Sequence, residues 1–361
     1  MNLTFEKTSD INLSQNKDRQ IAVLMSGGVD SSVTALLLKE QGYEVLGITM
    51  KLPLAGSEEK SCNGNDGAKV AYELNIPHYI INAEDIFRKY VIEPFRKDYE
   101  KGYTPSPCVD CNEKIKFGYI WDFIEENFSI THLATGHYAK IYKNQEGWHL
   151  ARGRDKNRDQ SYFLYGIKAK RLPYLHFPLE PYTKAQVREI AENHGMKIAD
   201  KPDSMELCFA GEGDYRSALS QVSFPGYIID TSGKILKEHK GIENYTIGQR
   251  KGLGVSAPYP LYVTDINIKE NTVTLGKKEE GMTDTVTIHK LNIIEYSKAK
   301  TGYECYGKIR SNGDPKKCII LSADENTAKI QFEEPFFRVA PGQKTVLYDK
   351  NDNIILGGTN I

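Results

Sequence analysis

Short apolar runs alternate with longer amphipathic segments over the first 140 residues of the chain. Four runs have the length and composition of buried strands, namely IAVLM (21–25), YEVLGITM (43–50), HYIIN (78–82) and THLATGH (131–137). Helical periodicity covers 31–41, 67–75, 84–100 and 112–128, with a kink expected at Pro94. This alternation predicts an α/β fold with a doubly wound parallel sheet, which binds ligands at the carboxyl ends of its strands.

The second half of the chain has a different pattern. One clean amphipathic helix is predicted over 183–195, where Gly195 provides a C-cap. Beyond about residue 210 the chain has short alternating runs, broken by turns such as T-S-G (231–233) and N-D-N (351–353). These runs are typical of small β domains or barrels, and we place boundaries near residues 212 and 285.

The composition excludes several classes of protein. With 361 residues, 26% charged and 40% hydrophobic, the chain is long enough for two or three domains and too apolar for disorder. No apolar run approaches the roughly 18 residues of a membrane span, and residues 1–19 lack the apolar core of a signal peptide. We therefore expect a soluble, cytoplasmic protein with no membrane partner, whose residues 1–19 form a flexible lead-in.

The net charge of −1 hides an uneven distribution. Residues 140–171 carry nine Lys or Arg against three Asp or Glu, a local charge of +6. A nucleic-acid partner therefore stays open at this point, because it is the distribution of charge that matters for phosphate binding.

The segment Ser26–Ser32 (SGGVDSS) follows the first predicted strand and begins the first predicted helix. Its two glycines let a ligand approach the backbone, and the N–H groups at a helix N-terminus bind anions. It lacks the Gly-Lys-Ser/Thr of loops that cleave a γ-phosphate, while Asp30 supplies a carboxylate for Mg²⁺. We predict a nucleotide site here; the alternative is a tight turn in which Asp30 and the serines cap the helix.

Six cysteines are too few for a disulfide scaffold, so their context matters. Cys108 and Cys111 stand in TPSPCVDCN, whose prolines predict a loop, with Cys111 close to the start of the next helix. That position lowers the pKa of a thiol and favours the nucleophilic thiolate. Cys208 follows in an acidic segment, DSMELCF, whereas Cys305 and Cys318 lie in β runs and are expected to be small buried side chains.

Ser26–Ser32 resembles the S-G-G-x-D-S-S signature of the pyrophosphatase-loop ATP family, whose members cleave ATP between the α- and β-phosphates. Over residues 20 to about 345, the chain resembles a narrower family, the bacterial tRNA-specific 2-thiouridylases. Seven segments in the order of that family carry the resemblance: SGGVDSS, ATGHYAK, RDQSYFL, PLEPYTKAQVREIA in part, KPDSMELCF, YTIGQRKGLGV and RVAPGQ.

This resemblance implies an ATP pyrophosphatase domain at 20–212, of the adenine nucleotide hydrolase-like fold, a small central domain at 213–284, and a tRNA-contacting β-barrel at 285–361. It implies ATP and Mg²⁺ as cofactors, and as partners tRNAs of the Lys, Glu and Gln type and a persulfide sulfur-donor protein. In the implied reaction, ATP adenylylates the oxygen on carbon 2 of uridine 34. Sulfur from a cysteine persulfide then replaces that oxygen, with release of AMP and pyrophosphate.

The resemblance also implies residue roles, position by position. Cys111 would be the nucleophile, and Cys208 would carry the persulfide. The ATP pocket would be lined by Leu24, Met25, Ser26, Gly27, Gly28, Val29, Asp30, Ser31, Met50 and Gly136. The target base would lie against Ser106, Pro107 and Cys108. Other tRNA contacts would come from His137, Arg158, Asp159, Gln160, Arg310, Ser311 and Gln343. Of these, Arg158 lies in the basic stretch, and Gln160 offers a donor and an acceptor to a base edge.

One departure from the family concerns the segment around the first thiols. The family has N-P-D-x-x-C there, whereas this chain has S-P-C-V-D-C, so Cys108 replaces the usual Asp and a carboxylate follows at Asp110. With Cys208 this gives three thiols, a set that can bind zinc or an iron–sulfur cluster with one open position. An iron–sulfur-dependent tRNA thiolase on Cys108, Cys111 and Cys208 is therefore an alternative.

Two other functions stay open. An amide-forming synthetase of the same ATP superfamily would need no reactive cysteine. A non-catalytic RNA-binding protein would need neither the phosphate loop nor the thiols. The presence of both favours the thiolase, which needs the base oxygen activated because a uracil oxygen is a very poor leaving group.

Overall fold

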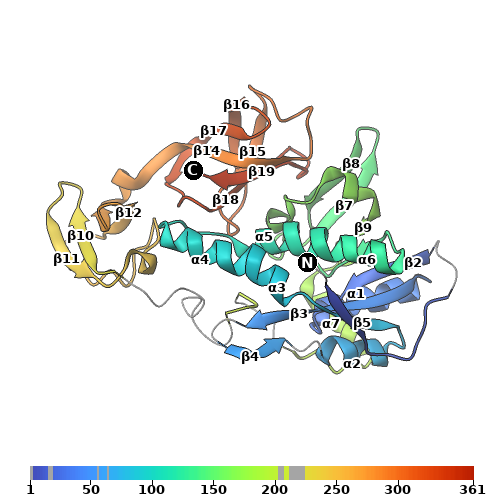
Figure 1. Ribbon diagram of the computed structural model, residues 1–361. Helices are drawn as coiled ribbons and strands as arrows, with labels where there is room; N and C mark the ends of the chain where they lie inside the picture. The colour runs from blue at the N-terminus through green and yellow to red at the C-terminus, as the bar shows by residue number, and fades with distance from the viewer. Residues whose placement is uncertain (1–2, 15–18, 55–56, 63–64, 202–206, 211–223) are drawn as a thin grey trace. The chain divides into compact units, whose positions relative to one another are not determined.

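The computed structural model describes residues 3–14, 19–54, 57–62, 65–201, 207–210 and 224–361 (Figure 1). The chain forms two compact units, each made of two stretches. Unit 1 comprises Met1–Ile92 and Cys108–Ala218, and unit 2 comprises Glu93–Pro107 and Leu219–Ile361. Within the described ranges, no helix is both long and apolar enough to cross a lipid bilayer.

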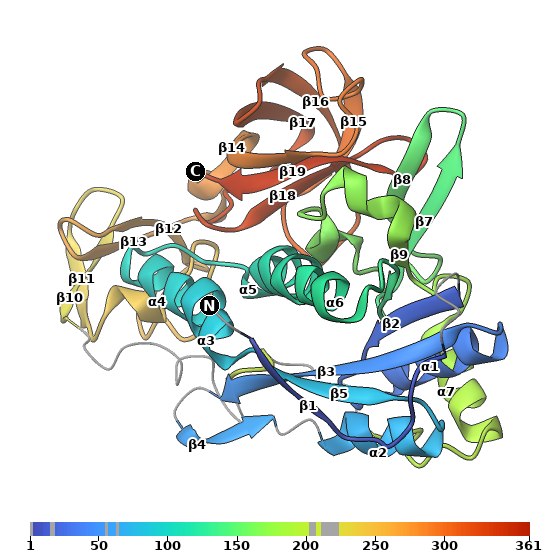
Figure 2. The ribbon, with the colours of Figure 1, turned by 45° about the vertical axis from the view of Figure 1, so that its right-hand side comes forward.

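Unit 1 is built on a seven-stranded sheet (Figure 2). Its strands are β1 (Thr4–Lys7), β2 (Gln20–Leu24), β3 (Glu44–Leu54), β4 (Ser57–Cys62), β5 (His78–Asn82), β6 (Leu133–Ala134) and β9 (Leu175–His176). Their order is β1-β5-β3-β2-β6-β9, with β4 paired to β3 off this path. All neighbours from β5 to β9 are parallel, whereas β1 and β4 are antiparallel to their partners. The predicted doubly wound parallel sheet is thus confirmed.

The order of the strands reverses at β2. From β2 the sheet extends to β3 and β5 on one side and to β6 and β9 on the other. The loops after β2 and β6 diverge at such a switch point and open a crevice. The register pairs Leu24 with Ile48 and Ala22 with Leu133, so β2 and β6 end close together at this crevice, while β3 continues past it to Leu54. β6 keeps two of the seven residues predicted for it, because the chain lines the crevice from Thr135 onward.

Helices cover both faces of this sheet, as Figures 1 and 2 show for α2 and α6. The helices up to residue 193 are α1 (Val29–Glu40), α2 (Asn65–Glu73), α3 (Glu84–Phe87), the π-helix η2 (Arg88–Ile92), α4 (Glu93–Glu100), α5 (Pro107–Asp110), the π-helix η3 (Cys111–Ile120), α6 (Trp121–Phe128), the 3₁₀-helices η4 (Ser161–Leu164) and η5 (Ala169–Tyr174), and α7 (Lys184–Asn193). α7 has the predicted ends, because Thr183 and Gln186 form a capping box and Gly195 adopts φ +63°.

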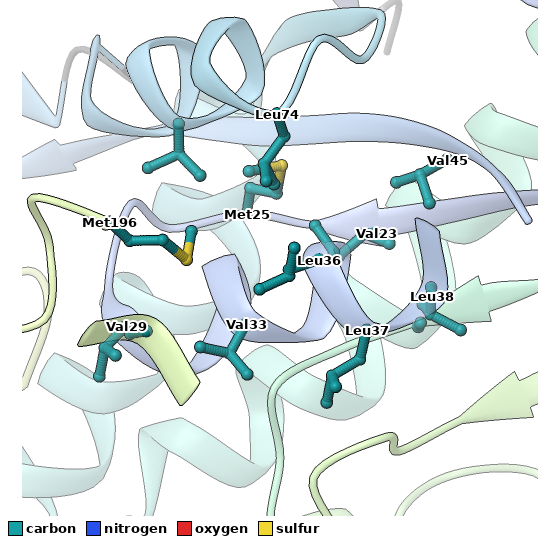
Figure 3. Close-up of a cluster of buried hydrophobic side chains, with 14 of the residues drawn as sticks. Val23, Met25, Val29, Val33, Leu36, Leu37, Leu38, Val45, Leu74 and Met196 are labelled. Carbon is teal, nitrogen blue, oxygen red and sulfur yellow. The ribbon is translucent and has the colours of Figure 1, made fainter. Parts of the chain in front are cut away.

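The core of unit 1 packs β2 against α1, α2 and α7 (Figure 3). Every residue of β2 is buried, as expected for a strand covered on both faces. Val23 and Met25 belong to one buried cluster with Leu36 of α1, and Leu74 and Met196 complete it. This packing fixes α1 and therefore the loop that joins β2 to it.

The first 19 residues are not a flexible lead-in throughout, because Thr4–Lys7 form β1 and pair with β5. The prediction is wrong for these residues. Their backbone pairs with β5, which would otherwise be an edge strand with unpaired N–H and C=O groups. The ring of Phe5 contacts those of Tyr79 and Phe123, with centroids 5.8 and 5.4 Å away. Residues 15–18 of the lead-in lie outside the described ranges.

The buried ring of His78 connects this N-terminal segment to the crevice. Thr8 Oγ1 lies 2.6 Å from its Nδ1, and Thr49 Oγ1 lies 2.8 Å from its Nε2. Thr49 also donates to the carbonyl of Met25 at 2.8 Å. Burial lowers the pKa of His78 to about 4, so the ring is neutral at pH 7.

Cys108 and Cys111 do not lie on a loop, which corrects a second prediction. α5 begins at Pro107, and η3 follows directly at Cys111. Proline is well accepted at the first position of a helix, because the N–H that it lacks has no partner there and its φ already fits. The prolines therefore mark the start of a helix, and both thiols lie in its first turns.

The predicted helices over 84–100 and 112–128 are observed, and each contains a π segment. η2 ends two residues before Pro94, whose ring crowds the carbonyl four residues earlier and removes one N–H. The expected kink thus takes the form of a π turn. In the second helix, Gly118 has non-helical dihedral angles at the end of η3.

Unit 2 contains a four-stranded sheet, with the order β11-β10-β13-β12, and a closed barrel, with the order β14-β17-β16-β15-β18-β19. The strands are β10 (Gly226–Asp230), β11 (Ile235–His239), β12 (Tyr262–Asn267), β13 (Thr272–Gly276), β14 (Met282–Ile293), β15 (Glu304–Lys308), β16 (Lys316–Ala323), β17 (Thr327–Phe337), β18 (Lys344–Tyr348) and β19 (Ile354–Asn360). The predicted hairpin turns are confirmed, with positive φ at Gly233 and Asp352. The β domains expected in this half of the chain are therefore present.

The stretch Glu93–Pro107 belongs to unit 2, although its neighbours in sequence belong to unit 1. It contains α4, and the N–H of Thr104 donates to the carbonyl of Pro341 at 2.8 Å. The segment that directly precedes the two thiols therefore belongs to unit 2.

Candidate active site

A pocket of about 630 Å³ opens in unit 1 where β2 and β6 end, beside the second half of β3. Nine of the ten residues predicted for ATP line it, all except Gly27. His137, Arg158 and Gln160 from the predicted tRNA set line it too, together with Cys208. The sequence does not predict the other lining residues, which are Ile48, Thr49, Leu52, Asn65, Asp66, Lys116, Thr135, Tyr138, Lys184 and Lys201. The volume suits a ligand of nucleotide size.

The loop Ser26–Ser32 has the backbone of an anion site. Gly27 has φ +71°, and a Cβ there would lie 2.3 Å from the Cβ of Asp66, so only glycine fits. α1 begins after Gly28 without a side-chain cap, and the hydroxyl of Ser32 donates to the carbonyl of Gly28 at 2.9 Å. The alternative of a capped turn is therefore not observed, and the N-terminus of α1 is open to an anion.

The carboxylate of Asp30 receives donors from distant parts of the chain. Lys184 Nζ lies 2.7 and 2.8 Å from its two oxygens, and Tyr138 Oη donates to Oδ1 at 2.8 Å. Lys184 is the first residue of α7, so the capping residue Thr183 fixes its place. Asp30 thus holds a nearly buried ammonium group beside the predicted phosphate site.

A second ammonium group lies at the same loop. Lys201 Nζ donates to Asp66 Oδ2 at 2.7 Å and to the carbonyl of Gly27 at 3.3 Å. The hydrogen bond from Lys201 holds the pKa of Asp66 below its usual value. Two lysines from the end of unit 1 thus lie at the loop, each paired with a carboxylate.

The loop after β6 packs on the start of α1. A Cβ on Gly136 would lie 2.8 Å from the carbonyl carbon of Asp30, so the two backbones touch. The next residue, His137, has Nδ1 at 2.7 Å from Thr135 Oγ1. Burial holds the pKa of His137 well below its usual value, so its ring is neutral at pH 7.

Asp159 and Gln160 have partners inside the protein. The buried carboxylate of Asp159 binds Arg152 Nε at 3.1 Å and the N–H of Gly153 at 3.1 Å. Gln160 Oε1 accepts from the N–H of Tyr138 at 3.0 Å. Arg152 ends a hairpin that the sequence does not predict, formed by β7 (Ala139–Asn144) and β8 (Gly147–Arg152). The contacts of Asp159 and Gln160 with tRNA stay predictions.

The two thiols of the helix are protonated at neutral pH. Cys111 is buried, and burial raises the pKa of its thiol to about 11. Cys108 has an exposed surface, yet the protein around its sulfur also raises its pKa, again mainly by desolvation. The predicted lowering of the Cys111 pKa is therefore wrong for this state, because lost hydration outweighs the nearby positive charge of Lys116.

Cys208 is exposed, as Cys108 is, but unlike Cys108 and Cys111 it lines the pocket. The acidic residues before it, 203–206, lie outside the described ranges. Across the part of the chain that the structure describes, no three His, Cys, Asp or Glu side chains are grouped to hold a metal ion. Cys108, Cys111 and Cys208 are thus not gathered into the cluster site of the alternative hypothesis.

The remaining predicted RNA-contacting residues belong to unit 2, and they are Ser106, Pro107, Arg310, Ser311 and Gln343. Arg310 is exposed, and a Cβ on Gly248 would lie 3.3 Å from its Nη2, which places it beside the basic segment YTIGQRKGLGV. Gln343 has a buried Oε1 with no hydrogen-bond partner among the described residues.

Three family models match the chain in succession. They are the tRNA methyl transferase HUP domain over residues 19–212, the tRNA methyl transferase PRC-barrel domain over 217–277, and the aminomethyltransferase beta-barrel domain over 283–361. Together they cover nearly all of both units.

Two relatives are similar over almost their whole length. The tRNA-specific 2-thiouridylase MnmA of Salinibacter ruber is 40% identical over 366 residues, which cover 95% of this chain and 94% of that protein. The tRNA-specific 2-thiouridylase MnmA of Carboxydothermus hydrogenoformans is 39% identical over 358 residues, 94% of this chain and 97% of that protein. Among solved structures, the U34-tRNA thiolase NcsA of Methanococcus maripaludis, with its [4Fe-4S] cluster, is 20% identical with a TM-score of 0.35. It covers 53% of this chain and 61% of that chain, a likeness too distant to argue from.

Proposed function

The chain belongs to the family of the tRNA-specific 2-thiouridylases, and we propose that it catalyses the ATP-dependent 2-thiolation of uridine 34 in tRNA. The observation that carries this proposal is the pocket, which an anion-binding loop and Cys208 line together. Thiolation needs both groups, because the base oxygen must be activated before sulfur can replace it. The protein is accordingly a tRNA-uridine 2-sulfurtransferase.

The phosphates of ATP are assigned to the N-terminus of α1 and to the ammonium groups of Lys184 and Lys201. ATP supplies the adenylyl group that turns the oxygen on carbon 2 into a leaving group. Asp30 and Asp66 line the pocket, and carboxylate oxygens are ligands that Mg²⁺ prefers. We therefore propose that Mg²⁺ binds beside the phosphates, where it would offset the charge of the phosphates. AMP and pyrophosphate are the expected products.

Sulfur transfer is assigned to Cys208 and Cys111. The terminal sulfur of a Cys208 persulfide attacks carbon 2, and AMP leaves. Cys111 then attacks the inner sulfur of Cys208, so that the electrons of the S–S bond go to the sulfur on the base and a Cys111–Cys208 disulfide forms. A thiol reductant restores both thiols, and a persulfide sulfur-donor protein recharges Cys208.

Several findings weigh against the other functions. The iron–sulfur alternative lacks a group of three donors among the described residues. An amide-forming synthetase would give no task to Cys208 in the pocket. Methyl transfer, which the description of the family model names, would leave both the phosphate loop and the thiols without a task.

Residues of each unit are proposed to contact tRNA. Arg158 and His137 line the pocket, and Arg310 lies beside a basic segment of unit 2. The other proposed contacts are Ser106, Pro107, Cys108, Asp159, Gln160, Ser311 and Gln343. We propose tRNAs of the Lys, Glu and Gln type as substrates, and the cytoplasmic location stays a prediction.

We also propose a division into three domains, at 20–212, 213–284 and 285–361. The limits of the three family models support it. The small sheet and the closed barrel of unit 2 correspond to the second and third of these domains.

Reconstitution tests the proposed function. The purified protein is incubated with Mg·ATP, unmodified tRNA and a persulfide donor, and the nucleosides of the tRNA are analysed by mass spectrometry. We expect 2-thiouridine together with tRNA-dependent AMP and pyrophosphate, and none with Cys208→Ala, which keeps ATP binding. Tightly coupled formation of ADP and phosphate, or full activity of Cys208→Ala, would contradict the proposal.

A further inference from the structure

The helix that carries the thiols contains ten residues of π-helix, η3. In a π-helix the backbone hydrogen bonds join residues five apart, so side chains at i and i+5 lie one turn above each other. Cys111 and Lys116 have this spacing. In an α-helix the neighbours of Cys111 one turn later would instead be Lys114 and Ile115.

Cys108 adds a second thiol near the same face. It precedes Cys111 by three residues across the α-helical turn of α5, which puts both on one side of the helix. The positive charge of Lys116 acts on both sulfurs and favours the thiolate of each. Lys116 is thus the cation that the π turn brings to the pair of thiols.

Lys116 also lines the nucleotide pocket. Its charge reaches His137 there and, after the larger effect of burial, lowers the pKa of that ring. Within the described ranges, Lys116 has no hydrogen-bond or ion-pair partner, whereas Lys114 on the same helix pairs with Asp110 at 3.0 Å. A half-buried, unpaired ammonium group between a phosphate pocket and two thiols is available to negative charge that develops during a reaction.

We propose that Lys116 is a positioning residue for sulfur transfer, whose ammonium group stabilises the thiolate of Cys111 when that sulfur attacks Cys208. The thiol proton leaves to solvent, and Lys116 stays protonated throughout, so it acts by its charge alone. The inference rests on the proposed role of Cys111. Its test reads the thiol itself without ATP or tRNA, so a failure of the proposed function would leave the result interpretable.

The groups that face Cys111 set the direction of the expected effect. Burial, Cys108 and Asp110 all raise the pKa of its thiol, and Lys116 alone among the residues acting on it opposes them. Removal of that charge should therefore raise the pKa further. A higher pKa leaves less thiolate at any pH below it, and loss of a neighbouring cation is expected to reduce the thiolate about tenfold.

The experiment measures the rate at which iodoacetamide modifies Cys111 and Cys108 between pH 7 and 10, with each site resolved by peptide mass spectrometry. Lys116→Met should slow both sites about tenfold, and Lys116→Arg should restore them. Lys114→Met is the matched control, since it removes the same charge from the same helix; it leaves Asp110 without its partner, and it should slow both sites far less than Lys116→Met does. Equal effects of the two Met variants, or no restoration by Arg, would overturn the proposal.

Titration of His137 by NMR separates lost charge from a damaged helix. Loss of a neighbouring cation raises the pKa of the Cys111 thiol and of the His137 ring alike. Entry of water instead lowers the thiol pKa and raises the ring pKa, because burial acts on the two groups in opposite directions. Parallel rises in Lys116→Met support the proposal, and shifts in opposite directions refute it.

Discussion

The phosphate loop and the thiol-bearing helix lie in one unit but hold their charges differently. At the loop the lysines are paired, Lys184 with Asp30 and Lys201 with Asp66. At the helix the thiols are protonated, and Lys116 has no partner among the described residues. The anion site of the loop is formed before ATP binds. At the helix, Lys116 is available to a thiolate that forms only during the reaction. The pairing of the lysines thus distinguishes the region proposed to bind the nucleotide from the region proposed to transfer sulfur.

The largest effect is expected at Gly27, where the phosphate loop requires a residue without a side chain. Gly27→Ala places a methyl group 2.3 Å from the Cβ of Asp66 at φ +71°, so the loop must shift and ATP affinity should fall by about a hundredfold or more. Gly195→Ala is the control, since Gly195 also has positive φ but has open space around its Cβ position. Calorimetric titration with ATP should show near-normal binding for the control. Similar losses in both variants would mean that φ strain, and not the close approach, matters.

The lysines of the loop should differ from each other. Lys184→Met leaves the partly exposed Asp30 carboxylate without its nearly buried cation, and the free energy of unfolding should fall by about 1 kcal/mol. Lys201→Met breaks a more exposed pair and should cost about 0.5 kcal/mol. Both variants should raise the KM for ATP if these lysines bind phosphate. Urea unfolding and steady-state kinetics measure the two effects, and an unchanged KM for both would remove the lysines from the phosphate site.

The pH dependence of Cys111 sharpens the contrast from the side of the helix. With a pKa of about 11, its alkylation rate should increase about tenfold per pH unit from 8 to 10 without a plateau. The folded-state pKa lies above the ordinary thiol value of 9.0, so Cys111 stabilises the fold below pH 9 and this stability is lost as the pH rises toward 11. An alkylation rate that levels off below pH 9 would show that the Cys111 thiolate is already stabilised in the resting protein. The loop and the helix would then not differ in this respect.

The smallest effect concerns tRNA. If Arg158 contacts a phosphate, Arg158→Ala should reduce the slope of log affinity against log salt by roughly 0.7–0.9. Lys7→Ala, which changes an exposed charge on β1, is the control and should leave the slope unchanged. Binding of tRNA at several salt concentrations measures both slopes. Equal slopes for Arg158→Ala and wild type would exclude Arg158 from the phosphate contacts.

Elements with local signals were predictable from the sequence. β5 spans the five residues predicted for it, and α7 has both its capping box and its terminal glycine in the chain. The phosphate loop was equally accessible, because its function depends on residues that are contiguous. Periodicity and turn chemistry act over a few residues, so a single sequence contains them.

Features that depend on distant contacts were missed. Lys184 lies 154 residues from Asp30 in sequence, and nothing in either segment signals their pairing. The raised pKa of Cys111 depends on burial by the folded chain, which overrides the helix start that the sequence suggests. The spacing of Cys111 and Lys116 is visible in the sequence, but it gains meaning only in a π-helix.

The interleaving of the two units in the chain has a consequence for dissection of the protein. A gene fragment that ends near residue 218 encodes all of unit 1. It also encodes Glu93–Pro107, which belongs to unit 2. In such a fragment the N–H of Thr104 loses the carbonyl of Pro341. The same fragment ends before the strands of the small sheet and the barrel. The pocket and the thiols lie within residues 20–212, but a fragment limited to this stretch would leave Glu93–Pro107 without its contacts in unit 2, so we expect the fragment to be less stable than the full chain.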